Sequence, residues 1–230
     1  MPAYQVANRI YLIGGPSITD KRDCCVYLLD GGGELALVDA GLGASGPAIV
    51  ANMQSLGYDP SMLKYVVATH GHIDHTGGLY YFRSRGAKIV CHAKELEAVS
   101  GGRPELTAAG YYGVKYRPVK VDVVLKEDEE TIRLGNVALC CLLTPGHTPG
   151  SISPYVDIGD TRILFGQDIH GPFNPAWGSN MEAWFSSMQK LLELKADILC
   201  EGHFGVYSPE SEVTRYINYY INLYQRHNQV

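Results

Sequence analysis

The sequence contains no run of eighteen or more apolar residues, and it opens on MPAYQVANRIYLIGG, which lacks the charged and then apolar pattern of a signal peptide. It also has no run of Lys or Arg, and its net charge is −5. The features typical of membrane-spanning chains and of nucleic-acid-binding proteins are therefore missing. We expect a small-molecule substrate, no nucleic-acid partner, no membrane partner and a cytoplasmic location, with a homodimer allowed.

The chain has six cysteines, but it has no Cys-x-x-Cys pair of the kind that binds structural zinc. The pairs Cys24–Cys25 and Cys140–Cys141 lie inside expected strands, where neighbouring side chains point to opposite faces, which is not the pattern of a disulfide framework. We interpret most of these thiols as small buried apolar groups. Cys91 and Cys200 lie near expected site loops, which leaves room for redox sensitivity.

The length of 230 residues suits one substantial core, and the sequence has no repeat and no low-complexity linker. We therefore predict a single domain over residues 1–230, whose first half ends near Lys115. The residue pattern predicts strands at 10–13, 24–29, 34–38, 64–68, 87–91, 119–125, 131–134, 137–143, 152–156, 162–165 and 197–200. It predicts helices at 47–56, 79–84, 94–99 and 181–194, and a last helix with Ser208 as N-cap and Pro209 in its first position.

What the sequence does have is a dense group of metal-binding side chains in residues 69–75, which read THGHIDH. An expected strand, KYVVA, precedes them. Alternate side chains of an extended segment point the same way, so His70 and His72 can reach one metal ion together. Asp74 and His75 follow where the chain must turn, and they can reach a second ion beside the first. Imidazole and carboxylate groups are ligands of zinc and of other borderline metals.

Three isolated candidates lie downstream, each in a segment with flanking glycine: His147 in TPGHTPGS, Asp168 in LFGQDIHG and His203 in LCEGHFG. Each alone is weak evidence, because an isolated Gly-His is more often part of a turn. Eight histidines in 230 residues is also an ordinary number, so surface histidines are the alternative interpretation. Three of the eight, however, lie within six residues beside an aspartate. With the downstream candidates they make five histidines and two aspartates, enough for two metal ions.

The order of these motifs resembles that of the metallo-β-lactamase superfamily, and most of all its glyoxalase II-like, binuclear branch. The matching features are HxHxDH, a His in a TPGHTPGS loop, a Gly-x-Asp after a strand and a late Gly-His, over a stretch from the strand pair ending at residues 38–41 to His203. The resemblance implies an α/β fold, a four-layer αββα sandwich with two sheets packed face to face and helices outside. It also implies two divalent metal ions, the first bound by His70, His72 and His147, the second by Asp74, His75 and His203, with Asp168 bridging both.

Two such ions would supply a metal-bound hydroxide near neutral pH, because zinc lowers the pKa of bound water to about 7. We therefore predict a hydrolase in which this hydroxide attacks a small ester, thioester or lactone-like substrate, with Asp74 and His170 as catalytic residues. Zinc is the expected metal, and iron and manganese are alternatives. His170, two residues after Asp168, is expected to bind substrate or to donate a proton to the leaving group; the alternative is a loop histidine in water.

Other residues near the motifs bear on the substrate and on the support of the site. The resemblance places Asp39, in VDAG, beneath the metal loop, although an Asp before Gly also suits a turn. Acyl-homoserine lactonases carry a Tyr three positions after the bridging Asp, where this chain has Gly171, so we expect no lactonase of that type. The aromatic residues of two expected loops either line an apolar acyl pocket or have a packing role: Tyr111, Tyr112, Tyr116, Phe173 and Trp177.

Two other functions are alternatives. The first is an iron-dependent oxidoreductase of the same fold, either similar to persulfide dioxygenases or a di-iron redox enzyme. The dioxygenases need one iron held by two His and one Asp, and the di-iron enzymes usually have Glu where His72 stands and need a flavin domain. The second is a non-catalytic metal-binding module, which seven intact ligand positions disfavour. The chain also ends soon after its last helix, so we expect none of the helical extension that binds glutathione in glyoxalase II enzymes.

Overall fold

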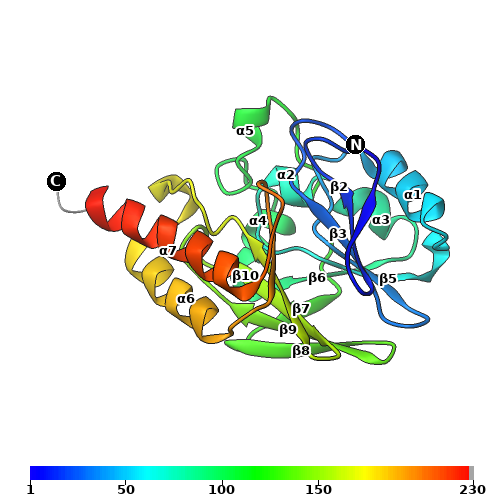
Figure 1. Ribbon diagram of the computed structural model, residues 1–230. Coiled ribbons are helices and arrows are strands. Elements are labelled where there is room, and N and C mark those ends of the chain that lie inside the picture. The colour runs from blue at the N-terminus through cyan, green and yellow to red at the C-terminus, as the bar shows by residue number, and fades with distance from the viewer. Residues whose placement is uncertain (228–230) are drawn as a thin grey trace.

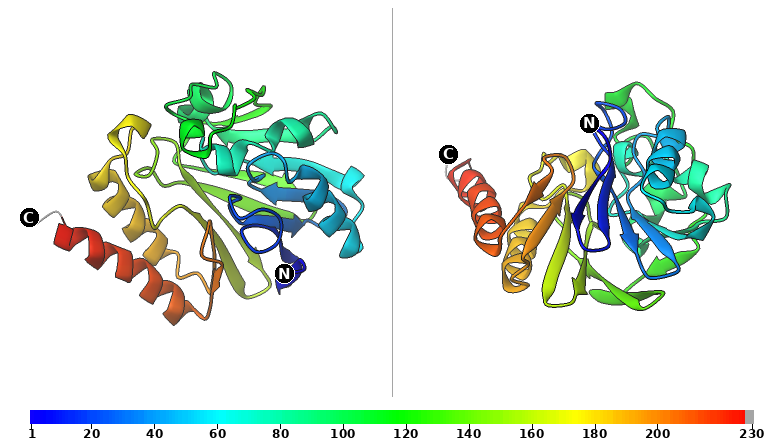
Figure 2. Two further views of the ribbon diagram at one scale, coloured as in Figure 1. Left: turned by 90° about the horizontal axis from the view of Figure 1, so that it is seen from above. Right: turned by 45° about the vertical axis from the view of Figure 1, so that its right-hand side comes forward.

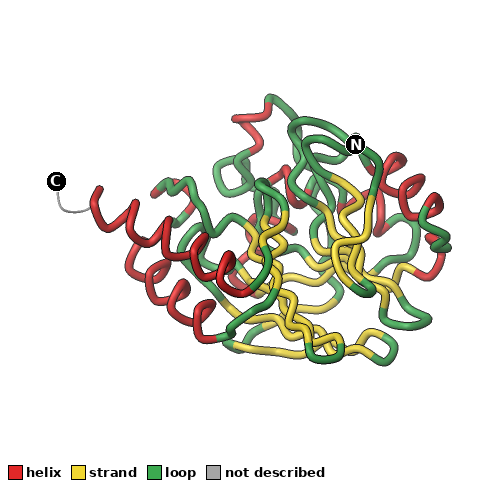
Figure 3. The backbone as a smooth tube through the Cα atoms, in the orientation of Figure 1, coloured by secondary structure: helices red, strands yellow, loops and turns green. Residues whose placement is uncertain are grey.

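The chain folds into two β-sheets that pack face to face, with helices on both outer faces (Figures 1 and 2). The computed structural model describes residues 1–227. The backbone tube in Figure 3 shows the strands between the helices at the left of the view and those at the right. This arrangement confirms the four-layer αββα sandwich that the sequence predicts.

The first sheet contains seven strands that follow one another in sequence order: β1 (Tyr4–Ala7), β2 (Ile10–Gly14), β3 (Val26–Asp30), β4 (Leu35–Val38), β5 (Leu63–Val67), β6 (Lys88–His92) and β7 (Val123–Leu125). Strands β1 to β4 pair antiparallel, whereas β4 to β7 pair parallel and are joined by crossovers that contain helices. The helices on its outer face are α1 (Gly46–Ser55), α3 (Leu79–Arg83) and α4 (Leu96–Val99). Their apolar side chains, such as Met53 and Phe82, are buried against the sheet.

The second sheet contains six strands: β8 (Glu129–Leu134), β9 (Val137–Leu143), β10 (Ile152–Ile158), β11 (Thr161–Gln167), β12 (Ile198–Glu201) and β13 (Val206–Tyr207). β11 and β12 pair parallel, and the other neighbours pair antiparallel. Helices α6 (Met181–Glu193) and α7 (Glu210–His227) cover its outer face. Trp184, Met188 and Leu191 recur at helical spacing on α6 and are buried, so this face of the helix packs on the sheet.

The main core lies between the two sheets. Val67 of β5 and Phe165 of β11 belong to one buried cluster on the inner faces. Their neighbours in the chain, Val66 and Leu164, point the opposite way and pack beneath the helices of each outer layer. These strands read as continuous apolar runs because both of their faces are buried.

Several elements differ from the predicted ones. The strand predicted over residues 119–125 begins only at Val123, because the backbone N–H of Val119 donates to Val99 O at the end of α4, at 3.1 Å. Since β7 pairs with β6, the first sheet extends to Leu125 and the first half of the chain does not end near Lys115. The last helix begins at Glu210, one position after Pro209.

Six short elements were not predicted: the strands β1 and β13, the helices α2 (Ile73–Thr76) and α5 (Ala109–Tyr112), and the 3-10 helices Pro60–Met62 and Pro175–Trp177. Segments of two to four residues are too short to show a periodic pattern. The loop that α5 interrupts and the turn that α2 forms both lie at the site described next.

Candidate metal centre

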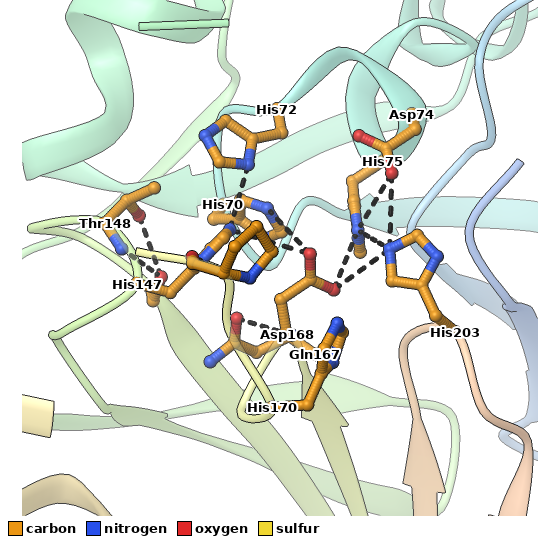
Figure 4. Close-up of polar contacts among 12 residues, drawn as sticks. His70, His72, Asp74, His75, His147, Thr148, Gln167, Asp168, His170 and His203 are labelled. Atoms are coloured by element: carbon orange, nitrogen blue, oxygen red, sulfur yellow. Dashed lines mark hydrogen bonds and ion pairs between the residues drawn. The ribbon is translucent and has the colours of Figure 1, made fainter. Parts of the chain in front are cut away.

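The seven predicted ligands come from both sheets and meet at one edge of the sandwich (Figure 4). They lie beyond the carboxyl ends of strands, a common place for ligand sites in α/β proteins. The contributing segments are the end of β5 (His70, His72), α2 (Asp74, His75), and the ends of β9 (His147), β11 (Asp168) and β12 (His203). The fold thus brings together all seven residues that the sequence singled out.

Four buried side chains form the first cluster: His70, His72, His147 and Asp168. His147 Nε2 lies 2.9 Å from His72 Nδ1 and 3.6 Å from Asp168 Oδ2. His70 Nε2 lies 4.0 Å from the same carboxylate oxygen and has no hydrogen-bond partner within residues 1–227. Leaving a buried polar atom unpaired is costly, and a metal ion among these donors would pair it.

The second cluster lies beside the first and consists of Asp74, His75 and His203. His203 Nε2 lies 3.3 Å from both Asp74 Oδ2 and His75 Nε2. The other oxygen of Asp168, Oδ1, lies 3.1 Å from His75 Nε2 and 3.2 Å from His203 Nε2. Asp168 therefore directs one carboxylate oxygen toward each cluster.

These separations suit a metal ion in each cluster. Metal–nitrogen bonds of about 2.0–2.1 Å in a tetrahedral arrangement place neighbouring donor atoms about 3.3 Å apart. The donor pairs of the second cluster lie between 3.1 and 3.7 Å apart. In the first cluster, the donor pairs that involve His147 or Asp168 lie between 2.9 and 4.0 Å apart. Imidazole and carboxylate are also the donor types that zinc and its neighbours accept.

The protonation of the three first-cluster histidines agrees with this fit. Burial lowers the pKa of His72 to about 3 and also lowers the pKa of His70 and of His147, so these rings are neutral, the form that binds metal. Burial acts the same way on His203, but the carboxylates of Asp168 and Asp74 outweigh it and raise the pKa of His203 to about 10. A divalent cation would take the place of the proton that these carboxylates stabilise on the ring.

Asp39 lies beneath the metal loop, where the resemblance places it. His75 Nδ1 donates to Asp39 Oδ2 at 2.7 Å, and Thr69 N donates to Asp39 Oδ1 at 2.8 Å. Asp39 follows β4 directly and has φ 63°, a left-handed conformation that Asp tolerates better than most residues. Its carboxylate holds Nδ1 of His75 and so turns Nε2 of that ring toward the second cluster.

His170 lies next to the second cluster, and a glutamate fixes its ring. His170 Nδ1 donates at 2.7 Å to Oε1 of Glu201, which is fully buried, and this leaves Nε2 available to the cavity that His170 lines. The other oxygen, Oε2, accepts hydrogen bonds from the backbone N–H groups of His203 and Phe204 at 2.6 and 2.8 Å. Glu201 is not among the residues predicted from the sequence; the signal for it is an acidic residue between the apolar run ILC and Gly-His.

A cavity of about 580 Å³ opens over the two clusters. Tyr111, Tyr112 and Trp177 line it, as the acyl-pocket interpretation expects, and Phe204, which the sequence analysis did not name, lines it too. Trp177 is buried, and its ring centroid lies 4.5 Å from that of His72 and 5.7 Å from that of His147. The indole thus forms the wall of the cavity at the first cluster.

Two of the five named aromatic residues have a packing role instead. Phe173 packs against the rings of Trp184 and Tyr224 under the second sheet's helices. Tyr116 is buried beside Ile73, and its hydroxyl donates to Val99 O at 3.1 Å. Neither residue lines the cavity over the clusters.

The cysteines behave as packing residues. Cys91 and Cys200 are both buried, and burial raises the pKa of the Cys91 thiol to about 12. Such a thiol is a poor nucleophile at neutral pH. Cys24 lies near Asp39 and His75, and burial raises the pKa of its thiol as well.

Comparison with known proteins decides the family. The sequence model of the metallo-β-lactamase superfamily matches residues 19–203, a stretch that contains every residue of both clusters. The chain belongs to the metallo-β-lactamase superfamily. A solved metallo-β-lactamase from Cronobacter sakazakii, HARLDQ motif mutant S60, shares the fold with a TM-score of 0.83 over 100% of this chain and 95% of that one, at 21% identity.

Two curated relatives in this superfamily are hydrolases. A hydroxyacylglutathione hydrolase of Anaeromyxobacter dehalogenans is 35% identical over 132 residues, which cover 57% of this chain and 41% of that protein. The acyl-coenzyme A thioesterase MBLAC2 of Bos taurus is 30% identical over 165 residues, which cover 63% of this chain and 57% of that protein. The matched segments thus span about half the length of these relatives. These matches confirm the predicted enzyme class, a metallo-hydrolase, and the likeness to glyoxalase II.

Proposed function

We propose that the chain is a binuclear metal-dependent hydrolase of small esters or thioesters. The observation that carries this proposal is the position of Asp168, whose two carboxylate oxygens lie one toward each cluster. In this proposal each ion has its own three ligands and shares Asp168: His70, His72 and His147 for the first, and Asp74, His75 and His203 for the second.

The ions would polarise a substrate carbonyl and lower the pKa of bound water, so that a nucleophile exists at neutral pH. The chain's own residues hold and orient the reacting groups. Asp39 fixes the ring of His75 through Nδ1. Glu201 fixes the ring of His170. When the ring is doubly protonated, its Nε2–H group is placed to give a proton to the departing oxygen or sulfur. Zinc is the metal we propose, and iron and manganese accept the same donors.

The cavity favours a substrate with a neutral, apolar acyl group. Within the part of the chain that the structure describes, no Lys or Arg lines it, so the metal ions would be its main positive charges. Apart from the ligands, the lining is mostly aromatic and proline side chains: Pro16, Tyr111, Tyr112, Pro172, Trp177 and Phe204. Two relatives are named for the hydrolysis of acyl compounds, hydroxyacylglutathione and acyl-coenzyme A, which supports an acyl substrate.

The other expectations concern the surroundings of the enzyme. In residues 1–227 no helix combines the length and the apolar character needed to cross a bilayer. The names of the relatives support a small-molecule substrate. A cytoplasmic location, a homodimer and a single domain over residues 1–230 stay predictions.

The first test of the proposal is metal content. We expect the wild-type chain to bind two metal ions and His203→Ala to bind one. His203 Nε2 contacts Asp74 and only one oxygen of Asp168, so the substitution removes a donor from the second cluster and leaves the first complete. Plasma mass spectrometry on dialysed protein measures metal per chain.

Tyr219→Ala is the control for this test, because Tyr219 is exposed on α7 and belongs to neither cluster. It should retain two ions. A wild-type chain that holds one iron and no second ion at saturation would contradict the hydrolase proposal and favour the oxidoreductase alternative.

A second test concerns the acyl pocket. Trp177→Ala should change the preference for acyl length, because the indole forms the cavity wall beside His72. It should leave metal content unchanged, because Trp177 belongs to neither cluster. We expect the ratio of kcat/KM for long over short acyl groups to rise by about tenfold, since one methylene in an apolar pocket is worth roughly 10–200-fold in discrimination. A series of p-nitrophenyl esters measures it. Tyr219→Ala, an exposed aromatic residue on α7, is the control, and an equal change for all acyl lengths would refute the pocket assignment.

A further inference from the structure

Glu95 is a buried carboxylate for which the chemistry proposed above gives no role. It ends a short 3-10 turn, Ala93–Glu95, that follows β6, and it is only 3% exposed. Its Oε2 accepts a hydrogen bond from Gly71 N at 2.7 Å. Its Oε1 accepts hydrogen bonds from Gly150 N at 2.7 Å and from Thr148 Oγ1 at 2.8 Å. Burial raises the pKa of Glu95 to about 7, and the three converging donors act in the opposite direction by stabilising the ionised carboxylate.

The partners of Glu95 lie next to the three histidines of the first cluster. Gly71 separates His70 from His72 after β5 of the first sheet. Thr148 directly follows His147 after β9 of the second sheet. One carboxylate therefore joins the two sheets at the place where the first cluster draws its ligands from both of them.

The glycines in these two motifs make room for the carboxylate. A Cβ on Gly71 would lie 2.4 Å from Ala98 Cβ and 2.8 Å from Glu95 Oε2, and a Cβ on Gly150 would lie 2.8 Å from Glu95 Oε1. Glycine in HGH and in TPGHTPG is thus explained by the close approach of the segment that contains Glu95 to both loops. A backbone hydrogen bond from Ile152 N to Thr69 O, at 2.8 Å, links the same loops, so Glu95 acts together with this link.

We propose that Glu95 is a positioning residue that sets the separation of His147 from the His70–His72 pair and thereby sets the metal affinity of the first cluster. This inference rests on the binuclear centre proposed above. The second cluster has a corresponding residue in Glu201, which binds the backbone N–H of His203. Because each cluster has its own buried glutamate, the effect of Glu95 should be confined to the first.

The experiment isolates each cluster in turn. His203→Ala leaves the first cluster complete, and His147→Ala leaves the second with all of its own ligands. Glu95→Gln is added to each background, and the chelator-treated proteins are titrated with Co²⁺ by calorimetry and by visible absorption. Gln keeps the size of the side chain, but its NH₂ group faces a donor in either orientation. We expect Co²⁺ to bind about 10–100-fold more weakly in the His203→Ala background, the usual cost of an outer-shell change, and with unchanged affinity in the His147→Ala background.

Glu97→Gln, an exposed position on α4, is the control and should change neither affinity. Unchanged Co²⁺ affinity of E95Q in the His203→Ala background would overturn the proposal. An equal loss in both backgrounds would also overturn it, because it would indicate general loosening of the fold. If E95Q does not fold, Thr148→Val is the second variant, because it removes one hydrogen-bond donor to Glu95 and keeps the carboxylate. A smaller loss of Co²⁺ affinity at the first cluster would support the proposed role of Glu95. Unchanged Co²⁺ affinity would overturn it. A wild-type chain that binds fewer than two Co²⁺ ions would contradict the binuclear proposal, while the His203→Ala comparison still decides the role of Glu95.

Discussion

Asp168→Ala should release both metal ions and lower turnover by about 10²-fold or more, given that even outer-shell changes at metal sites cost 10–100-fold. Asp168 Oδ1 lies 3.1 Å from His75 Nε2, and its Oδ2 lies 3.6 Å from His147 Nε2. One truncation therefore takes a donor from each cluster. Each of the other ligands serves a single cluster, so its loss should leave one ion. Metal per chain and kcat on an ester substrate measure the two effects.

Asp160→Ala is the matched control, because Asp160 is exposed in the turn that precedes the same strand, β11. It should retain both ions and normal turnover. Two bound ions and near-normal turnover in Asp168→Ala would contradict the bridging assignment. Loss of a single ion would instead assign Asp168 to one cluster.

The grouping of the seven side chains into two clusters could be predicted from the sequence because local chain geometry determines much of it. The backbone is extended at His72, with φ −66° and ψ 146°, so His70 and His72 reach the same cluster. The chain then turns into α2, which carries Asp74 and His75 to the second cluster. Strand alternation and a turn are both readable from residue types, and they place four of the seven side chains without knowledge of the rest of the fold.

The residues that support the ligands could not be predicted in the same way. Glu95 acts on the backbone N–H groups of Gly71 and Gly150, which are 24 and 55 residues away in the chain. Every residue except proline has a backbone N–H group, so the sequence does not show which of these groups will donate a hydrogen bond to Glu95. Loop side chains were hard to predict for a related reason. Phe173 is close in sequence to Asp168 but packs under the helices. Its direction could not be predicted, because an irregular loop has no periodic pattern that indicates where a side chain points.

His170→Ala should lower kcat by about 10²–10⁴-fold for substrates with poor leaving groups and change it little for activated esters. His170 Nδ1 is held by Glu201 at 2.7 Å, and the residue lines the cavity, so the Nε2–H group of the doubly protonated ring is placed to protonate a departing group. An alkoxide needs that proton to leave, whereas p-nitrophenolate does not. The measurement is the dependence of log kcat on leaving-group pKa for a series of aryl and alkyl esters, which should be steeper in the variant.

Tyr224→Phe is the matched control for His170, because the Tyr224 hydroxyl donates to His170 O at 2.8 Å and does not touch the imidazole. It should keep the leaving-group dependence of the wild type, so a steeper dependence confined to His170→Ala reports the ring itself. A rise in KM with unchanged kcat would make His170 a substrate-binding residue. An equal fall in rate for good and poor leaving groups would exclude the acid role. Loss of metal would mean that His170 is a ligand, because a proton donor held by Glu201 can be removed without taking a donor atom from either cluster.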